Sequence, residues 1–309
     1  MRLLSIEGVK ISRLAVQLGE REVENRSPSK DVIGFSTLRR AEASDSSASL
    51  QIAAAKKLEM DFSDFGAVIT VSFTQRDRRR SVSAQAQSAL GMPEDIVATD
   101  LLAACSGYGY GLYFAATLVK ATGKKVLLLD GDKQSDFLSL EDESTASVLA
   151  DGATATVLEP DDSGAKWTFA FRTDGAKSAA LTLENASPIK MDGFAVFRYV
   201  ASDVASAIKT FLAETGGKAD DFDAFLPHQA NLFMIRQLAR SLGFSPEKTL
   251  INSEKFGNTA SASVPIALAN SAERFRGRGA RLLLSGFGAG LSLFVADIPF
   301  EANFWYNIK

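Results

Sequence analysis

The chain of 309 residues contains a single cysteine, Cys105, and a single histidine, His228. One cysteine cannot form an intramolecular disulfide, and one cysteine with one histidine cannot build a Cys/His zinc site. A site that needs two or three imidazoles is excluded for the same reason. Acyl transfer through a nucleophilic cysteine needs only one residue of each type, so this chemistry remains open.

Cys105 ends the apolar run 100–105, DLLAAC, and small residues follow it before an apolar helix. A cysteine at a helix N-terminus feels the positive end of the helix dipole, which favours the thiolate. Ser106 and Gly107 leave room for a substrate to approach the sulfur. A lone cysteine in apolar sequence is more often an inert core residue, so Cys105 by itself does not establish a nucleophile.

Two further residues follow strand-like segments. His228 lies in PHQANL, between an apolar strand and a helix, and Asn258 lies in FGNTASASVP. Taken singly, His228 reads as a structural histidine and Asn258 as a helix N-cap. The glycine-rich segment 285–291, SGFGAGL, can offer backbone N–H groups to an anion, although a glycine-rich loop alone is weak evidence.

These residues need elements to position them, and the chain shows short apolar runs that alternate with segments of helical period. The pattern predicts strands at 67–72, 125–130, 222–226 and 281–286, and helices at 82–90, 203–215 and 232–242. Such alternation indicates a layered α/β fold with largely buried sheets. The loosest stretch, residues 159–166, lies about halfway along the chain.

Two segments in the first half of the chain also resemble two segments in the second half. Residues 65–70, FGAVIT, resemble residues 222–227, FDAFLP, and residues 123–129 resemble residues 279–284, offsets of 157 and 156. Two nearly equal offsets indicate a duplicated half, with chance similarity between apolar strands as the alternative. Under duplication, Cys105 and Asn258 occupy equivalent strand-to-helix turns that face each other across a pseudo-twofold axis.

Composition narrows the class of protein. Thirty-four basic and 37 acidic residues give a formal net charge of −3, which offers no reason to expect nucleic acid, and 46% apolar residues suit a soluble globular chain. The N-terminus shows no signal-peptide pattern, so a cytoplasmic location is expected. The uncharged stretch 101–119 is long enough for a membrane span, but the glycines in its first half favour a turn and a packed helix.

Together these segments resemble the β-ketoacyl-[acyl-carrier-protein] synthase III family of the thiolase superfamily. The likeness extends from about Arg39 to the C-terminus, whereas the first 35 or so residues match poorly. It rests on DLLAACSGYGYGL around Cys105, LADGATATVLE from Leu149, MDGFAVF from Met191, PHQANL around His228, FGNTASASVPIAL around Asn258 and the terminal GFGAGLSLF.

The resemblance implies an α/β fold of five αβαβα layers, built from two similar halves, residues 1–160 and 161–309, and a homodimer. It implies that Cys105 accepts an acyl group while backbone N–H groups of Cys105 and Ala289 hold the oxyanion. His228 and Asn258 would then stabilise the enolate that forms as malonyl on acyl carrier protein loses carbon dioxide. The product is a 3-ketoacyl thioester, in fatty-acid initiation or a specialised lipid, polyketide or secondary-metabolite pathway.

The same resemblance implies the substrates and excludes cofactors. Acyl-coenzyme A or acyl carrier protein brings the priming group, and neither a metal nor a redox cofactor is required. Members of the family normally carry an N-terminal aromatic residue and an Arg-Thr-Gly segment that hold coenzyme A. The comparable stretch here, DVIGFSTLRR at 31–40, contains no Trp and no Arg-Thr-Gly. Glu141 and Glu143 would repel a phosphorylated nucleotide that lay nearby. A carrier-protein or other thioester donor is therefore the alternative to acyl-coenzyme A.

Further residues are assigned to the substrate pocket and to docking. Gly193, Phe194 and Phe287 are expected to line the pocket. The basic loop 75–81, QRDRRRS, is either solvated or uses one of its arginines at positions 78, 79 and 80, Arg79 above all, to bind a polar end of the acyl group.

The docking assignment rests on a helix. Relatives usually have an arginine where Phe233 stands, but Arg236 and Arg240 share one face of the predicted helix 232–242. They are expected to meet an acidic carrier protein, with simple solvation of the helix as the alternative.

Two other functions stay open. Some relatives pass the acyl group from the cysteine to an alcohol or amine, and the presence of Asn258 favours condensation over this transfer because the enolate needs its donor. A structural subunit of a heterodimeric synthase is the second, and the presence of Cys105, His228 and Asn258 argues against it. No nucleic acid and no membrane is expected as a partner.

Overall fold

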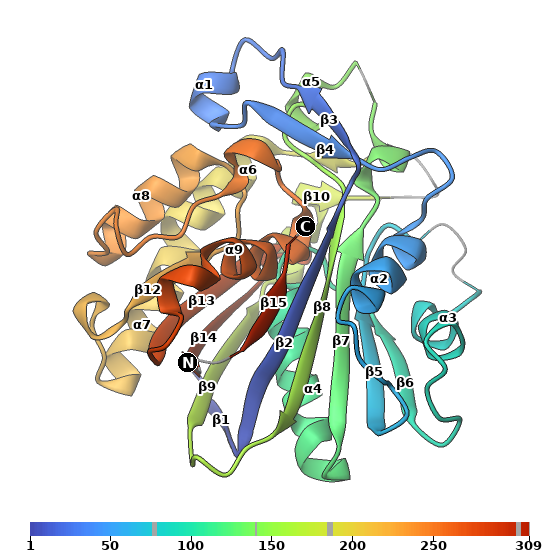
Figure 1. Ribbon diagram of the computed structural model, residues 1–309. Helices are drawn as coiled ribbons and strands as arrows, with labels where there is room; N and C mark the ends of the chain where they lie inside the picture. Colours follow the sequence, from blue (N-terminus) through green and yellow to red (C-terminus); the bar gives the residue numbers. More distant parts are fainter. Residues whose placement is uncertain (76–78, 140, 184–187, 301–303, 309) are drawn as a thin grey trace.

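The structure is a computed structural model that describes residues 1–75, 79–139, 141–183, 188–300 and 304–308. In this part of the chain, two large β-sheets are stacked with helices between and outside them (Figure 1). The first sheet runs, in spatial order, β15 (Trp305–Asn307), β2 (Val9–Leu18), β8 (Gly152–Pro160), β7 (Lys125–Asp132), β5 (Phe65–Val71) and β6 (Val97–Leu101). The second runs β1 (Leu4–Glu7), β9 (Lys166–Thr173), β14 (Ser292–Phe300), β13 (Ala280–Gly288) and β12 (Ala224–Pro227).

Six helices complete five layers. The inner pair, α4 (Gly107–Thr122) and α9 (Ser263–Ser271), contacts both sheets. The outer helices are α2 (Ser47–Lys56) and α3 (Val82–Ala89) on the first sheet, and α7 (Ala205–Thr215) and α8 (Leu232–Leu242) on the second. The order is therefore αβαβα, as the family resemblance implies.

Shorter elements gather at one end of the sheets, at the top of Figure 1. They are the hairpin β3 (Arg21–Glu24) and β4 (Thr37–Arg40), the pair β10 (Leu181–Thr182) and β11 (Lys190–Met191), and the helices α1 (Lys30–Ile33), α5 (Glu143–Ala146) and α6 (Gly193–Tyr199). These elements form the surroundings of the cavity described below.

The predicted elements are confirmed with small shifts. The strands predicted at 67–72, 125–130, 222–226 and 281–286 are β5, β7, β12 and β13, and helix 232–242 is α8 without change. The helix predicted at 203–215 differs at its start. A π-helical turn, η3 (Val200–Val204), joins α6 to α7 and makes one continuous helical segment, which a pattern of period 3.6 does not reveal.

The topology follows the sequence repeat. Strands β5 and β7 are parallel neighbours in the first sheet, and their counterparts β12 and β13 are parallel neighbours in the second. The chain ends depart from the two predicted halves, 1–160 and 161–309. Strand β1 pairs with β9 in the second sheet, and β15 pairs with β2 in the first, so each half lends a strand to the sheet of the other.

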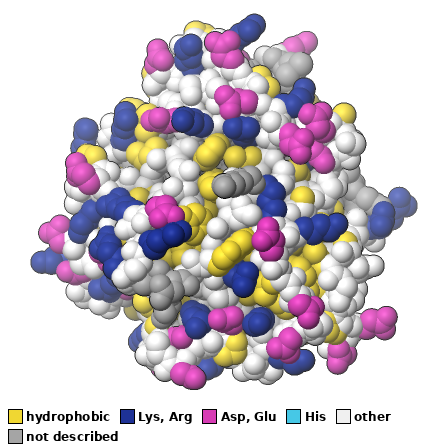
Figure 2. Space-filling view, viewed as in Figure 1, with side chains coloured by type: hydrophobic (Ala, Val, Ile, Leu, Met, Phe, Trp, Pro, Cys, Tyr) yellow, Lys and Arg dark blue, Asp and Glu magenta, His cyan; other side chains and the backbone are white. Residues whose placement is uncertain are grey.

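The uncharged stretch 101–119 is a buried inner helix and the turn before it. A Cβ built on Gly109 of α4 would lie 2.0 Å from Cγ of Phe294 on β14, so only glycine allows this helix to pack so closely on the second sheet. Within the described residues, no helix has the length and apolar character needed to cross a membrane. On the face shown in Figure 2, Lys and Arg side chains are interspersed with Asp and Glu.

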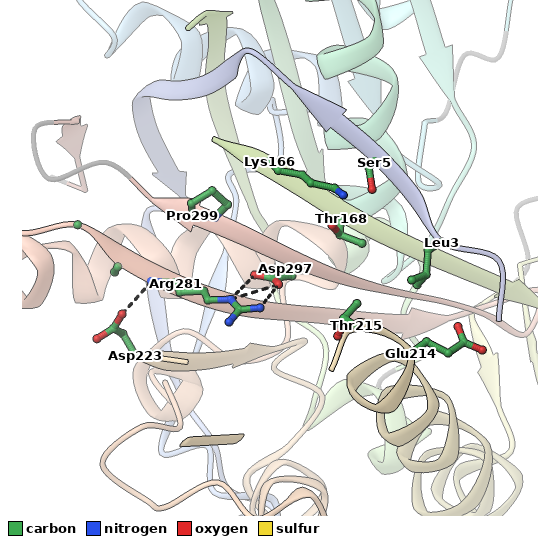
Figure 3. A pocket seen from close by; sticks show the side chains of 12 residues that line it. Leu3, Ser5, Lys166, Thr168, Glu214, Thr215, Asp223, Arg281, Asp297 and Pro299 are labelled. Atoms are coloured by element: carbon green, nitrogen blue, oxygen red, sulfur yellow. Dashed lines mark hydrogen bonds and ion pairs between the residues drawn. The ribbon is translucent and has the colours of Figure 1, made fainter. Parts of the chain in front are cut away.

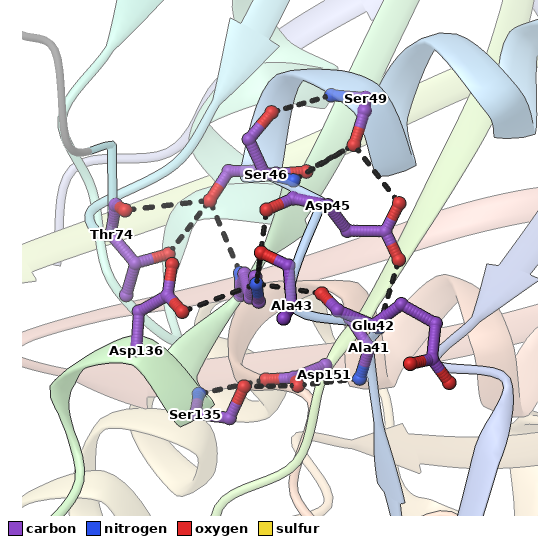
Figure 4. A network of polar contacts seen from close by, with 12 residues as sticks. Ala41, Glu42, Ala43, Asp45, Ser46, Ser49, Thr74, Ser135, Asp136 and Asp151 are labelled. Carbon is purple, nitrogen blue, oxygen red and sulfur yellow. Dashed lines mark hydrogen bonds and ion pairs between the residues drawn. The ribbon is translucent and has the colours of Figure 1, made fainter.

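A polar network fixes the region where β7 ends (Figure 4). The ammonium of Lys133, which is only 3% exposed, donates to the carbonyls of Glu42, Ala43 and Asp45 at 2.8, 3.3 and 3.0 Å. It also pairs with Asp136 at 3.2 Å. A buried charge is tolerated because every one of these contacts is an oxygen. The network ties the end of β7 to the loop that begins α2.

Candidate active site

One cavity of about 670 Å³ brings together Cys105, His228 and Asn258. The three residues precede helices that belong to both halves: Cys105 lies before α4, His228 lies between β12 and α8, and Asn258 lies before α9. All three are more than nine-tenths buried. The structure therefore places the three candidate residues in the wall of one cavity.

The position of Cys105 before a helix favours the thiolate, but its burial acts in the opposite direction. Burial raises the pKa of the Cys105 thiol to about 12, and the nearby carboxyl of Asp132 acts in the same direction. Helix α4 begins two residues later, at Gly107. A backbone hydrogen bond at Cys105 lowers the thiol pKa, but its effect is smaller than that of burial.

His228 is held by a serine on the inner helix α9. Its Nδ1 lies 2.8 Å from Oγ of Ser263, and the same Oγ accepts the backbone N–H of Gln229 at 3.2 Å. The Ser263 hydroxyl proton is then available to Nδ1, which favours the tautomer with the proton on Nε2. Burial lowers the pKa of His228 to about 3, with the backbone of Ala260 acting in the opposite direction, so the imidazole is neutral.

The side-chain amide of Asn258 is oriented by a hydrogen bond to its oxygen. Its Oδ1 accepts the backbone N–H of Ala260 at 2.9 Å, which leaves Nδ2 as the group that can donate to a ligand. Ala260 has a φ of +53°, a left-handed conformation that a residue with a Cβ rarely adopts. The backbone of Asn258 pairs with Val148 and Ala150 of the other half, through N–O distances of 2.9 and 2.8 Å.

Two buried carboxyls lie near the nucleophile at the end of β7. Asp130 accepts the hydroxyl proton of Ser261, which belongs to the same segment as Asn258. Asp132 accepts from Ser72, from Thr74 and from two backbone N–H groups through its Oδ1. Burial raises the pKa of Asp130 well above its ordinary value and also raises that of Asp132. Asp130 thereby links the half that carries Cys105 to the half that carries Asn258.

The glycine-rich strand end packs directly on Cys105. A Cβ built on Gly288 would lie 2.8 Å from the backbone nitrogen of Cys105 and 3.0 Å from its Cβ. Ala289 follows at the end of β13 and lines a neighbouring hollow together with Ala104. Cys105 and Ala289 thus belong to adjacent segments, but Ala289 is not among the residues that line the cavity of Cys105.

The other predicted pocket residues divide into two groups. Gly193 and Phe287 line the cavity, and the Phe287 ring meets the His228 imidazole edge-on with centroids 5.2 Å apart. Phe194 is 70% exposed and borders a separate hollow, because α6 turns this side chain away from the cavity. Arg79 is exposed and does not line the cavity of its own chain, and Arg78 lies outside the described residues.

The mouth of the cavity carries an acidic side chain and exposed apolar ones. Glu143 of α5 lines it, whereas Glu141 is exposed outside it. On α8, Arg236 and Arg240 are exposed on the outer face, and Phe233 is 42% exposed and stacks on Phe197 at 5.8 Å. The two arginines therefore remain accessible to a partner.

A second cavity, of about 630 Å³, lies across strands β1, β9, β14 and β13 of the second sheet (Figure 3). Its arginine, Arg281, forms a two-pronged ion pair with Asp297, with Nε–Oδ1 and Nη2–Oδ2 distances of 3.1 and 2.7 Å. The backbone N–H of Arg281 donates to Asp223 at 2.8 Å. Because these charges satisfy one another, and because Cys105 and His228 lie elsewhere, this cavity is not the candidate site.

Sequence reasoning missed three residues that the structure places at the site: Gln134, Ser261 and Ser263. Gln134 follows a buried strand in DGDKQSD, and polar residues after a strand end are a signal that could have been followed. In the sequence, Ser261 and Ser263 are recognisable only as small residues near the start of a helix. In the described part of the chain, no group of three or more His, Cys, Asp or Glu side chains is arranged to hold a metal ion.

The comparisons with known proteins agree with this geometry. A family model described as 3-oxoacyl-[acyl-carrier-protein (ACP)] synthase III matches residues 99–175, and the model of the C-terminal part of that synthase matches residues 212–298. The β-ketoacyl-[acyl-carrier-protein] synthase III of Streptococcus uberis is 34% identical over 275 residues, which cover 82% of this chain and 85% of that protein. The chain belongs to the β-ketoacyl-[acyl-carrier-protein] synthase III family.

Several solved structures share the fold over nearly the whole chain. A 3-oxoacyl-(acyl-carrier protein) synthase of Burkholderia xenovorans superposes with a TM-score of 0.93 at 28% identity, covering 99% of this chain and 98% of that one. The priming β-ketosynthase of the R1128 polyketide pathway gives 0.85 at 27% identity, covering 97% and 98%. OleA of Xanthomonas campestris, at 18% identity and a TM-score of 0.87, shows the fold alone.

The membership confirms two predictions made from the sequence. The protein is a condensing enzyme of the acyltransferase class, and its fold is the five-layered one of the thiolase superfamily. The assignment of steps to individual side chains goes beyond the comparisons and is taken up next.

Proposed function

We propose that this condensing enzyme works in two half-reactions through Cys105. The Cys105 sulfur attacks an acyl thioester, the bond between the acyl carbon and the donor sulfur breaks, and the donor leaves as a thiol that carries the proton. Backbone N–H groups of Cys105 and Ala289 would hold the oxyanion of the intermediate. The observation that carries this proposal is one cavity in which the only cysteine and the only histidine of the chain meet Asn258.

In the second half-reaction, a malonyl thioester on acyl carrier protein enters. Its carboxylate leaves as carbon dioxide, and the electron pair passes to the adjacent carbon as an enolate. Nε2–H of His228 and Nδ2–H of Asn258 donate to the thioester oxygen and stabilise that charge. The carbon then attacks the acyl group on Cys105, the carbon–sulfur bond breaks, and the sulfur regains a proton while a 3-ketoacyl thioester departs.

The neutral state of both site groups suits these roles. A neutral imidazole with its proton on Nε2 donates a hydrogen bond and has no net charge to lose, and Asn258 cannot exchange a proton at all. Both therefore stabilise a developing oxyanion without becoming acids. Fatty-acid initiation and specialised lipid or polyketide pathways use this same chemistry, and the site does not separate them.

Intact-mass analysis tests the proposal. The protein is incubated with a panel of acyl thioesters, on coenzyme A and on carrier protein, and we expect a mass gain of one acyl group that is absent from Cys105→Ser. An adduct that persists in Cys105→Ser would contradict the nucleophile assignment. The panel also compares donors: Glu143 at the mouth favours carrier-protein delivery over the phosphorylated coenzyme A nucleotide.

The exposed edge of the first sheet favours a second copy of the chain as a partner. Strand β6 lies at the edge of that sheet, and its side chains are largely exposed. The apolar residues Val97, Leu102 and Phe114 are exposed there by 44, 84 and 44%. An open strand edge beside apolar side chains is a surface that pairs with another strand. Carrier protein is the other proposed partner, with Arg236 and Arg240 as its docking residues.

The basic loop supplies one specificity hypothesis. Arg79 and Arg80 are exposed and lie outside the cavity of their own chain, so they would reach an acyl group only across a dimer. If they bind a carboxylate, dicarboxylic acyl donors should acylate Cys105 faster than acetyl or branched short-chain donors. The opposite preference would refute this hypothesis.

A further inference from the structure

One aromatic side chain lies between the cavity of Cys105 and the neighbouring hollow that Ala104 and Ala289 line. The hollow measures about 620 Å³, close to the 670 Å³ of the cavity itself. Among the described residues, Phe73 is the only one that lines both spaces. Its side chain is half-buried, so a ligand in either space can touch the ring.

The two spaces meet beside the nucleophile. Cys105 lines the cavity, and Ala104, the residue before it, lines the hollow. At the end of β13, Gly288 lines the cavity and Ala289 lines the hollow. Because consecutive residues divide between the two spaces at both places, the wall is one residue thick there, and Phe73 forms the rest of it.

The backbone that carries the Phe73 ring is fixed. Oδ1 of Asp132 accepts the backbone N–H groups of Phe73 and Thr74 at 2.9 and 3.0 Å, and the hydroxyl of Ser72 at 2.7 Å. The ring packs against an apolar cluster of Phe35, Leu38, Phe137, Val148, Leu149 and Ile189. A side chain held by both its backbone and its packing acts as a firm wall toward a ligand.

The hollow behind the ring suits a hydrocarbon chain. None of the described residues that line it is charged, and most are apolar, namely Phe73, Leu101, Leu102, Ala103, Ala104, Phe114, Leu183 and Ala289. Leu102 and Phe114 belong to the surface proposed above for a second copy, which would cover the hollow. Each methylene group that leaves water for such a space strengthens binding about fourfold.

We propose that Phe73 limits the length of the acyl group that Cys105 accepts, because its ring closes the cavity toward the hollow. The proposal rests on the two half-reactions above and adds a substrate class to them, short saturated acyl groups. The donor arm occupies the path from the mouth to the sulfur, so the acyl chain must lie in the remaining space, which Phe73 bounds. The arginine hypothesis concerns a polar end of the acyl group, whereas this proposal concerns its length.

Phe137 provides a matched control. It ends the short helix η1 (Gln134–Phe137) and belongs to the apolar cluster on which Phe73 packs. It is buried and lines neither the cavity nor the hollow. Removal of either ring therefore loosens the same cluster, but only removal of the Phe73 ring joins the two spaces.

The experiment compares butyryl and decanoyl N-acetylcysteamine thioesters, both below the concentration at which they form micelles. Initial rates of Cys105 acylation are measured by intact mass on the full chain of the wild type, Phe73→Ala, Phe73→Leu and Phe137→Ala. We expect the wild type to prefer the butyryl donor by about tenfold or more. Phe73→Ala should react faster with the decanoyl donor and raise the decanoyl-to-butyryl ratio by about tenfold or more, since the longer chain then finds apolar space. Phe73→Leu should raise this ratio less, and Phe137→Ala should keep the wild-type ratio even if its melting temperature falls.

The outcomes are distinct. A wild-type ratio near one, or a preference for decanoyl, overturns the proposal without any variant. A faster decanoyl reaction in Phe73→Ala supports it, because poor folding cannot produce a gain. An unchanged ratio in both Phe73 variants overturns it, since another part of the wall, or a second copy that fills the hollow, would then set the limit. An equal rise in Phe137→Ala also overturns it, because looser packing would explain the gain.

The same measurements separate this proposal from the proposed function. Acylation of Cys105 by the butyryl donor with one ratio in all four proteins supports the first half-reaction while it refutes the length limit. Absence of any adduct, with both donors and in every protein, refutes the half-reactions themselves.

Discussion

The imidazole of His228 and the hydroxyl of Ser263 lie 2.8 Å apart in a fully buried contact between the β12–α8 turn and the first residue of α9. The contact places the tautomer of the histidine under the control of the segment that also carries Asn258. The two proposed enolate donors are therefore aligned by one stretch of chain, residues 258–263. Changes in this stretch should affect the second half-reaction more than the first.

Replacing Ser263 by alanine should slow condensation and spare acylation. Without its hydroxyl, Nδ1 of His228 loses the partner that favours the Nε2–H tautomer, and one oxyanion donor is weakened by about 1–2 kcal/mol, or about fivefold to thirtyfold in kcat. Release of carbon dioxide from a malonyl thioester and Cys105 acylation are measured separately. Ser263→Thr, which keeps the hydroxyl, should restore the rate, and a failure of this rescue would refute the tautomer argument.

Asn258→Ala should leave Cys105 acylation nearly intact and reduce decarboxylation by about 10²–10³-fold, the usual effect of losing one oxyanion donor. Asn258→Asp provides the sharper comparison. Its retained oxygen can still accept the Ala260 N–H, but its second oxygen cannot donate, so it should fail at decarboxylation to a similar degree. Equal loss of both half-reactions would instead indicate that Asn258 serves the structure.

The reaction of Cys105 with an alkylating reagent should rise with pH throughout the accessible range. Because burial raises the pKa of the thiol to about 12, the thiolate fraction grows about tenfold per pH unit from pH 6 to pH 9 and reaches no plateau there. His228, with a pKa near 3, adds no step in this range. Since the chain has one cysteine, Cys105→Ser contains no thiol and serves as the negative control. A plateau of the alkylation rate near pH 7 would contradict a thiol pKa raised by burial.

Asp130→Asn should stabilise the protein increasingly as the pH rises. The pKa of Asp130 is raised in the folded state, so between the unfolded and folded values the native chain binds more protons than the unfolded one, and stability falls with pH, by up to about 1.4 kcal/mol per unit. Asparagine removes this dependence and can still bond Ser261. Urea unfolding at pH 5 and pH 8 measures the difference between wild type and variant, which should be larger at pH 8. A constant difference would show that the carboxyl does not titrate in this window.

Leu102→Glu should produce a monomer if β6 forms the dimer edge. The introduced carboxylate would meet its own copy, or an apolar surface, and either contact opposes association. Light scattering on the protein as it elutes from a size-exclusion column gives the molar mass of the wild type and of the variant. Val32→Glu is the matched control, because Val32 is 64% exposed at a different place, near the cavity mouth, and should leave the mass unchanged. A wild-type monomer would exclude the proposed dimer directly.

Much of the fold could be read from local pattern. The range of helix α8 is predicted residue for residue because its apolar positions recur with helical period. The structure shows what ends it: the Asn231 side chain accepts the Met234 N–H at the start, and Gly243 is in a left-handed conformation at the end. The duplicated strands were found for a similar reason, since fully buried strands leave continuous apolar runs. The π-helical turn at Val200–Val204 has no comparable local signature.

The site was predictable only as far as residue type goes. The scarcity of cysteine and histidine pointed to Cys105 and His228, but the thiol state depends on how deeply the surrounding layers bury the sulfur, which no neighbouring residue reveals. Gln134 and Ser263 act through partners 124 and 35 positions away. Such contacts arise from the meeting of two halves, and a single sequence does not encode their distance in any local pattern.

The exchange of end strands between the sheets has a consequence for cutting the chain. A break in the exposed turn between β8 and β9 would give two fragments, and each would keep one strand, β1 or β15, that completes the sheet of the other. One fragment would also hold the sulfur, and the other the imidazole and the amide. Neither piece could carry out acyl chemistry alone, but their reassembly would restore it, so this enzyme is suited to serve as a split reporter whose signal is thioester turnover.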